Sequence, residues 1–328
     1  MVDGKRDERV LAVDLGGTNL RVAVVDSDGT LSHRQHAPTD GHLGPDSVLA
    51  RMAALIQAVA ADAALPPDAP VGIASPGPIN PHDGTVYFTP NLPGWRDVPL
   101  GPTIERLTGR KTRCANDANC AGLGEASFGA ARGSRNVVYI GLGTGIGGAV
   151  VANGQLIDGH RGLGAELGHM CVAMDGTRCT CGGQGCLETY VAGWAIARDA
   201  QLVATTVDGA GIVAAAEGGP IHAGVLSKAA AQGDEMAIFL LDRAGQALGV
   251  ALGTLINIFN PERVVIGGGV ARIGEPLLGP AKRRVSSHCF AAFRDDVKIV
   301  EATLGDDGGL LGAAALALAT RMPSPASA

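Results

Sequence analysis

One pattern of apolar and polar positions occurs twice along the chain: an apolar run, a glycine-rich turn and a second apolar run. The first copy has Val10 to Val13, the turn Asp14-Leu15-Gly16-Gly17-Thr18-Asn19, and then Leu20 to Val25. The second copy lies within Asn136 to Val151, where VVYIGL, the turn GTGIGG and AVV follow one another. Each copy predicts a strand, a tight turn and a second strand. Two copies about 130 residues apart predict a duplicated fold, with one copy in each of two domains.

The segments between and after these copies contain apolar residues at helical spacing or in continuous apolar stretches, which predict further helices and strands. Ser47 to Ala61 is predicted to be a helix, and Val71 to Ala74 a buried strand. The segment from Glu235 to Phe259 predicts a long helix that stops at Asn260-Pro261. A further strand, Val264 to Ile266, runs directly into three glycines. Strands and helices therefore alternate, as in an α/β protein.

The length of 328 residues suggests two domains at roughly 150 residues each. We expect a small amino-terminal α/β domain over residues 1–115 and a larger α/β domain over residues 116–308. The last apolar helix, residues 309–320, is expected to pack back on the first domain. The tail rich in Pro, Ser and Ala, residues 321–328, is expected to be disordered.

Composition narrows the classes of protein. Glycine accounts for 49 of 328 residues, about twice its average share, but the glycines follow no three-residue period and 46% of residues are hydrophobic, so collagen and disorder are excluded. A net charge of −6 argues against a broad nucleic-acid-binding face. The longest charge-free stretch is broken by glycines, and the charged amino terminus does not resemble a signal peptide. We therefore expect a cytoplasmic protein without a membrane span.

The glycine turns are candidate phosphate sites. Backbone N–H groups of Gly16 and Gly17 can approach an anion closely, Thr18 adds a hydroxyl donor, and Asp14 could orient a magnesium ion through water. An ordinary hairpin turn is the alternative. Gly143-Thr144-Gly145 at the matching place in the second copy favours phosphate binding, although neither turn fits a P-loop or a dinucleotide fingerprint.

Two further segments could carry chemistry. Asn116-Asp117 follows a predicted strand and begins a helix, so either residue could simply cap that helix. A phosphoryl transfer to an alcohol needs a carboxylate to accept the hydroxyl proton, and Asp117 is the candidate base with Asn116 beside it. Gly267-Gly268-Gly269 could let a flat base lie against the backbone, or could be a turn alone.

A histidine and three cysteines form a candidate zinc site. His169, Cys179, Cys181 and Cys186 are the ligand types of a closed tetrahedral Cys3His site, and all four positions would be needed. Cys171 is a fifth candidate that four-coordinate zinc would leave out. Free thiols in a loop are the alternative. Glu166 and Glu188 bracket the cluster; they are either surface acids or, in a loop ordered by zinc, aimed at one polyol.

The motifs along the chain are, in sequence, DLGGTN, the Asn-Asp pair, GLGTGIGG, the EXGH element Glu166 to His169, CTCGGQGCLE and IGGGV. Their order resembles that of the ROK (repressor, ORF, kinase) family, most of all its bacterial glucokinases. The resemblance extends from Val10 to Ala315. The EXGH and CXCGXXGCXE elements together are its most specific part, since the glycine turns are shared with all actin-like sugar kinases.

The resemblance implies a two-domain actin-like ATPase (ribonuclease H-like) α/β fold with sugar and nucleotide in a cleft. It implies that Asp117 is the catalytic base and that a zinc loop spans residues 164–188, where His169 contacts both sugar and zinc. The residues implied to bind sugar are Gly77, Asn91, Asn116, Asp117, Glu166, His169 and Glu188. Those implied to bind nucleotide are Asp14, Gly16, Gly17, Thr18, Thr144, Gly145, Gly267 and Gly268.

The function expected from this resemblance is ATP-dependent, magnesium-requiring phosphorylation of the 6-hydroxyl of glucose, by a homodimer or homotetramer. Alternatives within the family are a kinase for mannose, fructose, N-acetylglucosamine or N-acetylmannosamine, or a polyphosphate-dependent enzyme. A non-catalytic sugar-sensing regulator is a third. The helix-turn-helix of family repressors has no counterpart before the first strand, so DNA binding is disfavoured.

Overall fold

The computed structural model describes residues 8–89, 91–294 and 296–319, and it divides into two compact units. The first unit reaches Gly133, takes in residues 156–164 and resumes at Asp306; the second unit contains residues 134–155 and 165–305. The predicted boundary near Ala115 thus falls inside the first unit. The predicted disordered tail, residues 321–328, lies outside the described residues.

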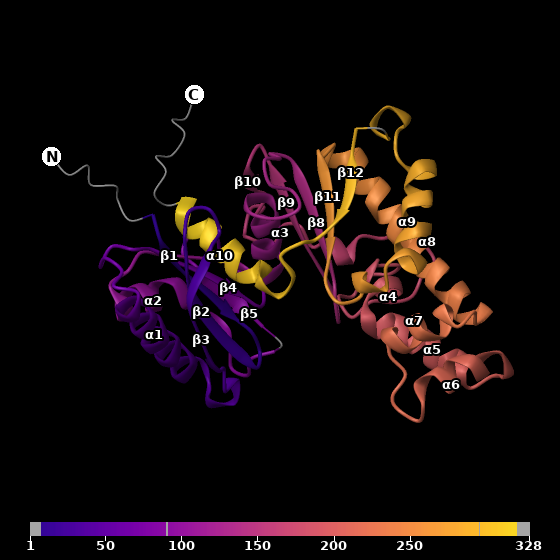
Figure 1. Ribbon diagram of the computed structural model, residues 1–328, viewed down its shortest axis with the longest axis horizontal. Coiled ribbons are helices and arrows are strands. Elements are labelled where there is room, and N and C mark those ends of the chain that lie inside the picture. Colours follow the sequence, from indigo (N-terminus) through magenta and orange to yellow (C-terminus); the bar gives the residue numbers. More distant parts are fainter. Residues whose placement is uncertain (1–7, 90, 295, 320–328) are drawn as a thin grey trace. The chain divides into compact units, whose positions relative to one another are not determined.

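The first unit is built on a five-stranded sheet in the order β3-β2-β1-β4-β7 (Figure 1). The β1–β2 and β2–β3 pairs are antiparallel, whereas β1–β4 and β4–β7 are parallel. The strands are β1 (Val10–Leu15), β2 (Asn19–Val25), β3 (Leu31–Pro38), β4 (Val71–Ser75) and β7 (Thr112–Asn116), and a separate hairpin joins β5 (Thr85–Phe88) to β6 (Arg96–Pro99). The helices are α1 (Pro45–Asp62), α2 (Leu100–Thr108), α3 (Asp117–Ser127) and α10 (Gly308–Ala319).

The second unit repeats this plan with the order β10-β9-β8-β11-β12. Again the first hairpin, β8–β9, is antiparallel and the later pairs, β8–β11 and β11–β12, are parallel. The strands are β8 (Val137–Leu142), β9 (Ile146–Ala152), β10 (Gln155–Leu156), β11 (Arg263–Gly267) and β12 (Lys298–Glu301). The helices are α4 (Glu188–Val191), α5 (Gly193–Ala204), α6 (Ala210–Ala216), α7 (Ala223–Ala231), α8 (Glu235–Phe259) and α9 (Glu275–His288).

The long helix α8 forms the centre of the second unit's core. By length and composition it could cross a membrane, yet 56% of its most apolar stretch is buried within the protein. Leu241, Leu248 and Leu252 have no exposed surface and belong to one cluster with the apolar side chains of β8 and α9. Hydrophobic burial against α9 therefore accounts for the apolar character of α8.

Contacts between backbones hold α10 in the first unit. A side chain at Gly312 would place its Cβ 1.7 Å from the Cys120 carbonyl oxygen of α3, and one at Gly72 of β4 would lie 1.7 Å from the Ala313 carbonyl oxygen. Gly124 of α3 faces Gly308 and Gly312 in the same way. Because only glycine permits these approaches, α3 packs with α10, which is why the first unit extends beyond Ala115.

We expect Gly312→Ala to lower the free energy of unfolding by about 1–3 kcal/mol or more, because the added methyl group forces α10 away from α3. Urea unfolding followed by circular dichroism measures the change. Ala50→Ser, at an exposed position of α1 in the same unit, is the control and should change stability by under about 0.5 kcal/mol. Equal midpoints for the two variants would contradict the close contact.

Candidate active site

The predicted site residues of the first unit gather where the parallel strands β1, β4 and β7 end. The carboxyl ends of parallel neighbours meet at one edge of a sheet. Asp14 lies near the end of β1, Gly77 follows β4, and Asn116 and Asp117 follow one another at the junction of β7 and α3. The sheet therefore brings together residues that lie about a hundred positions apart in sequence.

Asn116 has two structural contacts. Its Oδ1 accepts the Ala118 N–H at 3.0 Å and the Asn119 N–H at 3.4 Å, so it is the cap of α3. Its Nδ2 donates to the Gly77 carbonyl at 3.1 Å. Gly77 has a φ of +83°, and a Cβ there would lie 2.2 Å from the Phe88 carbonyl oxygen. The cap and the predicted sugar ligand are thus the same side chain, and it fixes the Gly77 loop.

Asp117 is the first residue of α3, and its Oδ1 accepts the Ala118 N–H at 2.8 Å. The carboxylate is reached by solvent, but the protein around it removes much of its hydration. That desolvation raises the pKa of Asp117, and the negative charge of Asp14 raises it further. A carboxylate with a raised pKa holds a proton more readily than an ordinary aspartate does, which suits a general base.

Asp14 is paired with a residue that the sequence reasoning missed. Arg21 of β2 lies directly opposite Asp14 in the β1–β2 register. Its Nε donates to Asp14 Oδ2 at 3.1 Å, and its terminal nitrogen binds the same oxygen and the Asp306 carbonyl, the latter at 2.8 Å. The signal for this contact was the spacing of seven residues across the hairpin turn, which places both side chains on one face of the two strands.

The turn between β1 and β2 leaves donors free for a ligand. The Gly16 N–H is used by the Asn19 carbonyl at 2.9 Å, and the Gly16 carbonyl accepts the Thr39 hydroxyl at 2.7 Å. Gly17 and Thr18 are exposed, and their N–H groups bind no other residue of the described chain. Asn91 lies beside this turn, since a Cβ at Gly17 would be 3.5 Å from the Asn91 Cβ.

The matching turn of the second unit is held by its surroundings. Gly143 donates to the Gly145 carbonyl at 2.9 Å, and its own carbonyl accepts the Gly193 N–H at 2.8 Å. The N–H of Ile146 donates to Glu188 Oε2 at 2.9 Å. Glu188 was predicted as a sugar ligand, and in the structure one of its oxygens is engaged by this turn.

Beside the turn lies a cavity of about 730 Å³, within the range of small-molecule sites. Thr144 lines it together with Gly269, Trp194, His222 and Arg272. The predicted Gly267 and Gly268 do not line it: a Cβ at Gly267 would face the Tyr139 hydroxyl, and Gly268 packs on Leu142. The third glycine of the run is the one that faces the cavity. Trp194, His222 and Arg272 carry no motif that sequence reasoning could have used.

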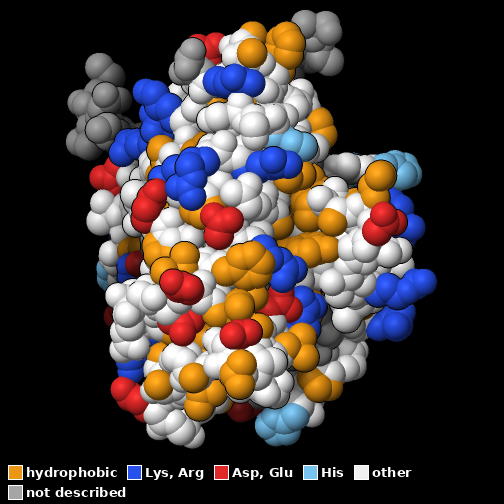
Figure 2. Space-filling model, turned by 90° about the vertical axis from the view of Figure 1, so that its right-hand side faces the viewer, with side chains coloured by type: hydrophobic (Ala, Val, Ile, Leu, Met, Phe, Trp, Pro, Cys, Tyr) orange, Lys and Arg blue, Asp and Glu red, His pale blue; other side chains and the backbone are white. Residues whose placement is uncertain are grey.

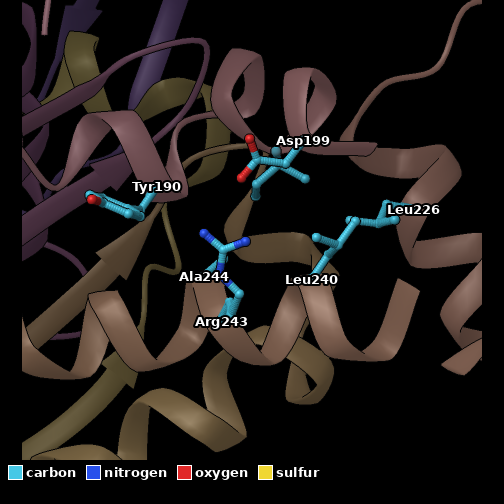
Figure 3. A pocket seen from close by; sticks show the side chains of 7 residues that line it. Tyr190, Asp199, Leu226, Leu240, Arg243 and Ala244 are labelled. Atoms are coloured by element: carbon cyan, nitrogen blue, oxygen red, sulfur yellow. The ribbon is translucent and has the colours of Figure 1, made fainter. Parts of the chain in front are cut away.

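A second hollow lies between α4, α5, α7 and α8 (Figure 3). Arg243 of α8 points between Tyr190 and Asp199 there. The hollow has a volume of about 10 Å³, which is room for about one water molecule. This hollow is therefore too small for a substrate.

The His169, Cys179, Cys181 and Cys186 side chains converge as the sequence predicts. Their ligand atoms all lie within 4.8 Å of one another. His169 Nδ1 is 3.7 Å from the Cys179 sulfur, and the sulfurs of Cys181 and Cys186 are also 3.7 Å apart. Sulfurs bound to one tetrahedral zinc at about 2.3 Å are separated by about 3.8 Å, so the cluster fits zinc in both chemistry and size.

Two neighbours of the cluster lie outside it. Cys171 is exposed and pairs through its backbone with Cys186, but its sulfur is no member of the cluster. Glu166 is exposed at the start of the short helical turn that carries His169, and its side chain has no hydrogen bond to the described residues. Because His169 turns Nδ1 to the thiols, its Nε2 remains for another partner.

Charge on the surface is mixed. Figure 2 shows Lys and Arg side chains interspersed with Asp and Glu on one face, with hydrophobic side chains scattered among them. That face therefore presents no broad field of one sign.

Comparisons with known proteins give one family. The family model described as the ROK family matches residues 10–320. A glucokinase of Thermotoga maritima is 40% identical over 310 residues, which cover 94% of this chain and 96% of that protein.

Solved structures agree with this result. A ROK hexokinase from Thermus thermophilus superposes with a TM-score of 0.82 at 33% identity, covering 95% of this chain and 98% of that one. A ROK family glucokinase from Streptomyces griseus, in complex with glucose and AMPPNP, superposes with a TM-score of 0.75 at 32% identity, covering 93% and 98%. The predicted actin-like two-domain α/β fold is confirmed.

Proposed function

The chain belongs to the ROK family, and from that premise we propose that it is a glucokinase, which transfers the terminal phosphoryl group of ATP to the 6-hydroxyl of glucose. The observation that carries the proposal is the near full-length similarity to a glucokinase at 40% identity. The candidate base, the glycine turns and the His-Cys loop all lie within residues 10–320, which the family model matches.

Asp117 is the general base of the proposed reaction. As the glucose oxygen forms its bond to phosphorus, its O–H bond breaks and the proton passes to the Asp117 carboxylate, while ADP leaves with the electrons of the broken P–O bond. The raised pKa of Asp117 matches it to this task. Asn116, which fixes Gly77 and caps α3, holds the base in place.

Backbone donors stabilise the transferring group. The exposed donors of Gly17 and Thr18 in one unit and the Thr144 turn in the other are offered to the nucleotide phosphates. The cavity beside Thr144 takes the nucleoside, with Trp194 as an apolar wall. Asp14 is the carboxylate that would be offered to a magnesium ion bound with ATP, which would neutralise phosphate charge.

We assign zinc to the His-Cys cluster in a structural role. The metal would order residues 164–188 and so fix His169, whose Nε2 is offered to a sugar hydroxyl beside Glu166 and Glu188. Gly77, Asn91 and Asn116 are the sugar contacts from the first unit. A cytoplasmic location and a homodimer or homotetramer complete the proposal, and gel filtration with light scattering tests the latter.

A coupled assay of ADP release across a panel of sugars tests the activity. We expect the highest kcat/KM with glucose and ATP, and a kcat/KM at least about tenfold lower with mannose, fructose, N-acetylglucosamine or N-acetylmannosamine, because each leaves a hydrogen-bonding group of the site unpaired. Preference for another sugar, or for polyphosphate as donor, would assign the chain to another kinase of the family. No turnover with any pair would favour a non-catalytic sugar-sensing regulator.

Asp117→Asn should lower kcat by about 10²–10⁴-fold, because the amide cannot accept the hydroxyl proton. Steady-state kinetics measure the loss, and circular dichroism should match the unsubstituted protein. Asp62→Asn, at an exposed position at the end of α1, is the control and should keep full activity. Turnover of Asp117→Asn within a few fold of normal would refute the assignment of the base.

Elemental analysis of protein purified without added metal should find about one zinc per chain. Cys181→Ser should lose the metal and lower Tm, because structural zinc contributes roughly 10–16 kcal/mol of apparent binding energy in zinc-finger peptides. Cys171→Ser, which removes an exposed thiol outside the cluster, should keep both. Loss of zinc from Cys181→Ser at an unchanged Tm would contradict the structural role.

A further inference from the structure

The Glu188 carboxylate lies against the backbone of the turn between β8 and β9. Its Oε2 accepts the Ile146 N–H at 2.9 Å, and a Cβ at Gly145 would lie only 2.8 Å from the same oxygen. The contact joins segments 42 residues apart in sequence. Glycine at position 145 is therefore the residue that lets this carboxylate reach the turn.

The remaining bonds of the turn are made by backbone alone. Within the turn, the Gly143 N–H donates to the Gly145 carbonyl. From outside it, the Gly193 N–H donates to the Gly143 carbonyl at 2.8 Å, and the Val270 N–H donates to the Leu142 carbonyl at 2.9 Å. Among the hydrogen bonds of the described residues, Glu188 is the side chain that supports residues 143–146. A half-buried charged acceptor makes a stronger bond to a backbone N–H than a neutral one does.

Glu188 is itself fixed by the His-Cys loop. It follows the cluster residue Cys186 by two positions, and the intervening Leu187 is fully buried and donates its N–H to the Met170 carbonyl at 2.9 Å. Glu188 then begins α4, where its carbonyl accepts the Ala192 N–H. The end of the loop thus sets the position of the carboxylate that supports the turn.

We propose that Glu188 is a positioning residue for the nucleotide phosphates: through the Ile146 N–H it holds the Thr144 turn in the conformation that receives them, so the His-Cys loop acts on donor binding as well as on sugar binding. The proposal rests on the proposed function, in which this turn binds phosphate. Oε1 of the same carboxylate remains available for a sugar hydroxyl.

Binding of MgADP in the absence of sugar separates this role from sugar binding. By isothermal titration calorimetry, Glu188→Ala should weaken ADP binding on the order of tenfold, because the Ile146 N–H loses its acceptor and the turn its support. Glu188→Gln should restore most of the affinity, because the amide oxygen can accept the same N–H.

Glu166→Ala is the matched control. Glu166 is the other acid predicted to bind sugar, but it is exposed and makes no bond to the turn. This variant should lose sugar affinity and keep ADP affinity within about twofold. If Glu188→Ala binds ADP as the unsubstituted protein does, the positioning role is refuted while the proposed kinase stands. If the unsubstituted protein binds no ADP, the donor site and the role built on it both fail.

Zinc content and circular dichroism show whether Glu188→Ala alters the His-Cys loop itself. If it does, a double-mutant cycle with Gly145→Ala tests the proposal instead. Gly145→Ala adds a methyl group that must displace the Glu188 carboxylate, so it should weaken ADP binding in the unsubstituted background. In the Glu188→Ala background the same methyl group meets no carboxylate and should have little further effect. Equal losses in both backgrounds would show a direct clash with the nucleotide and overturn the proposal.

Discussion

The position of the candidate site residues in the first unit depends on direct backbone contact of α10 with β4 and with α3. At Gly72 and Gly312 no side chain fits, because the carbonyls of Ala313 and Cys120 occupy its place. The first turn of α10 is thereby brought to the end of β1, where Gly309 lies against the Asp14 carboxylate. Arg21 then binds both Asp14 and the Asp306 carbonyl just before the helix. The position of Asp14 thus follows from helix packing as well as from its own strand.

In the second unit, glycines likewise allow two helices to pack closely. Along α8, glycines 245 and 249 face the Leu277 and Ala281 carbonyls of α9, so these two helices also approach through their backbones. Helix packing therefore accounts for some of the glycines that lie outside the phosphate turns. Close packing brings more atoms into contact per turn of helix, at the cost of the conformational entropy that glycine loses on folding.

Local features of the fold could be predicted from the sequence, and long-range ones could not. Both strand-turn-strand hairpins and the His-Cys cluster depend on residues within one short segment, so composition and spacing were sufficient. The contact of Gly312 with Cys120 joins segments far apart in the chain and has no periodicity that marks it. For this reason the sequence predicts a boundary near Ala115, whereas the first unit of the structure includes α3 and reaches Gly133. The contact of Arg21 with Asp14 could not be predicted, because it depends on which residues lie opposite one another in the β1–β2 pair.

Electrostatics links these structural details to the proposed chemistry. Desolvation raises the pKa of Asp117 and the negative charge of Asp14 raises it further, so both favour the protonated form of Asp117 as pH falls. A base must begin the reaction as carboxylate, so an unopposed Asp14 charge would shift activity toward higher pH. Arg21 forms an ion pair with Asp14, which places an opposite charge beside that carboxylate. The hairpin whose turn contains Gly17 and Thr18 therefore also carries the Arg21–Asp14 ion pair, and the Asp14 charge of that pair acts on the candidate base Asp117.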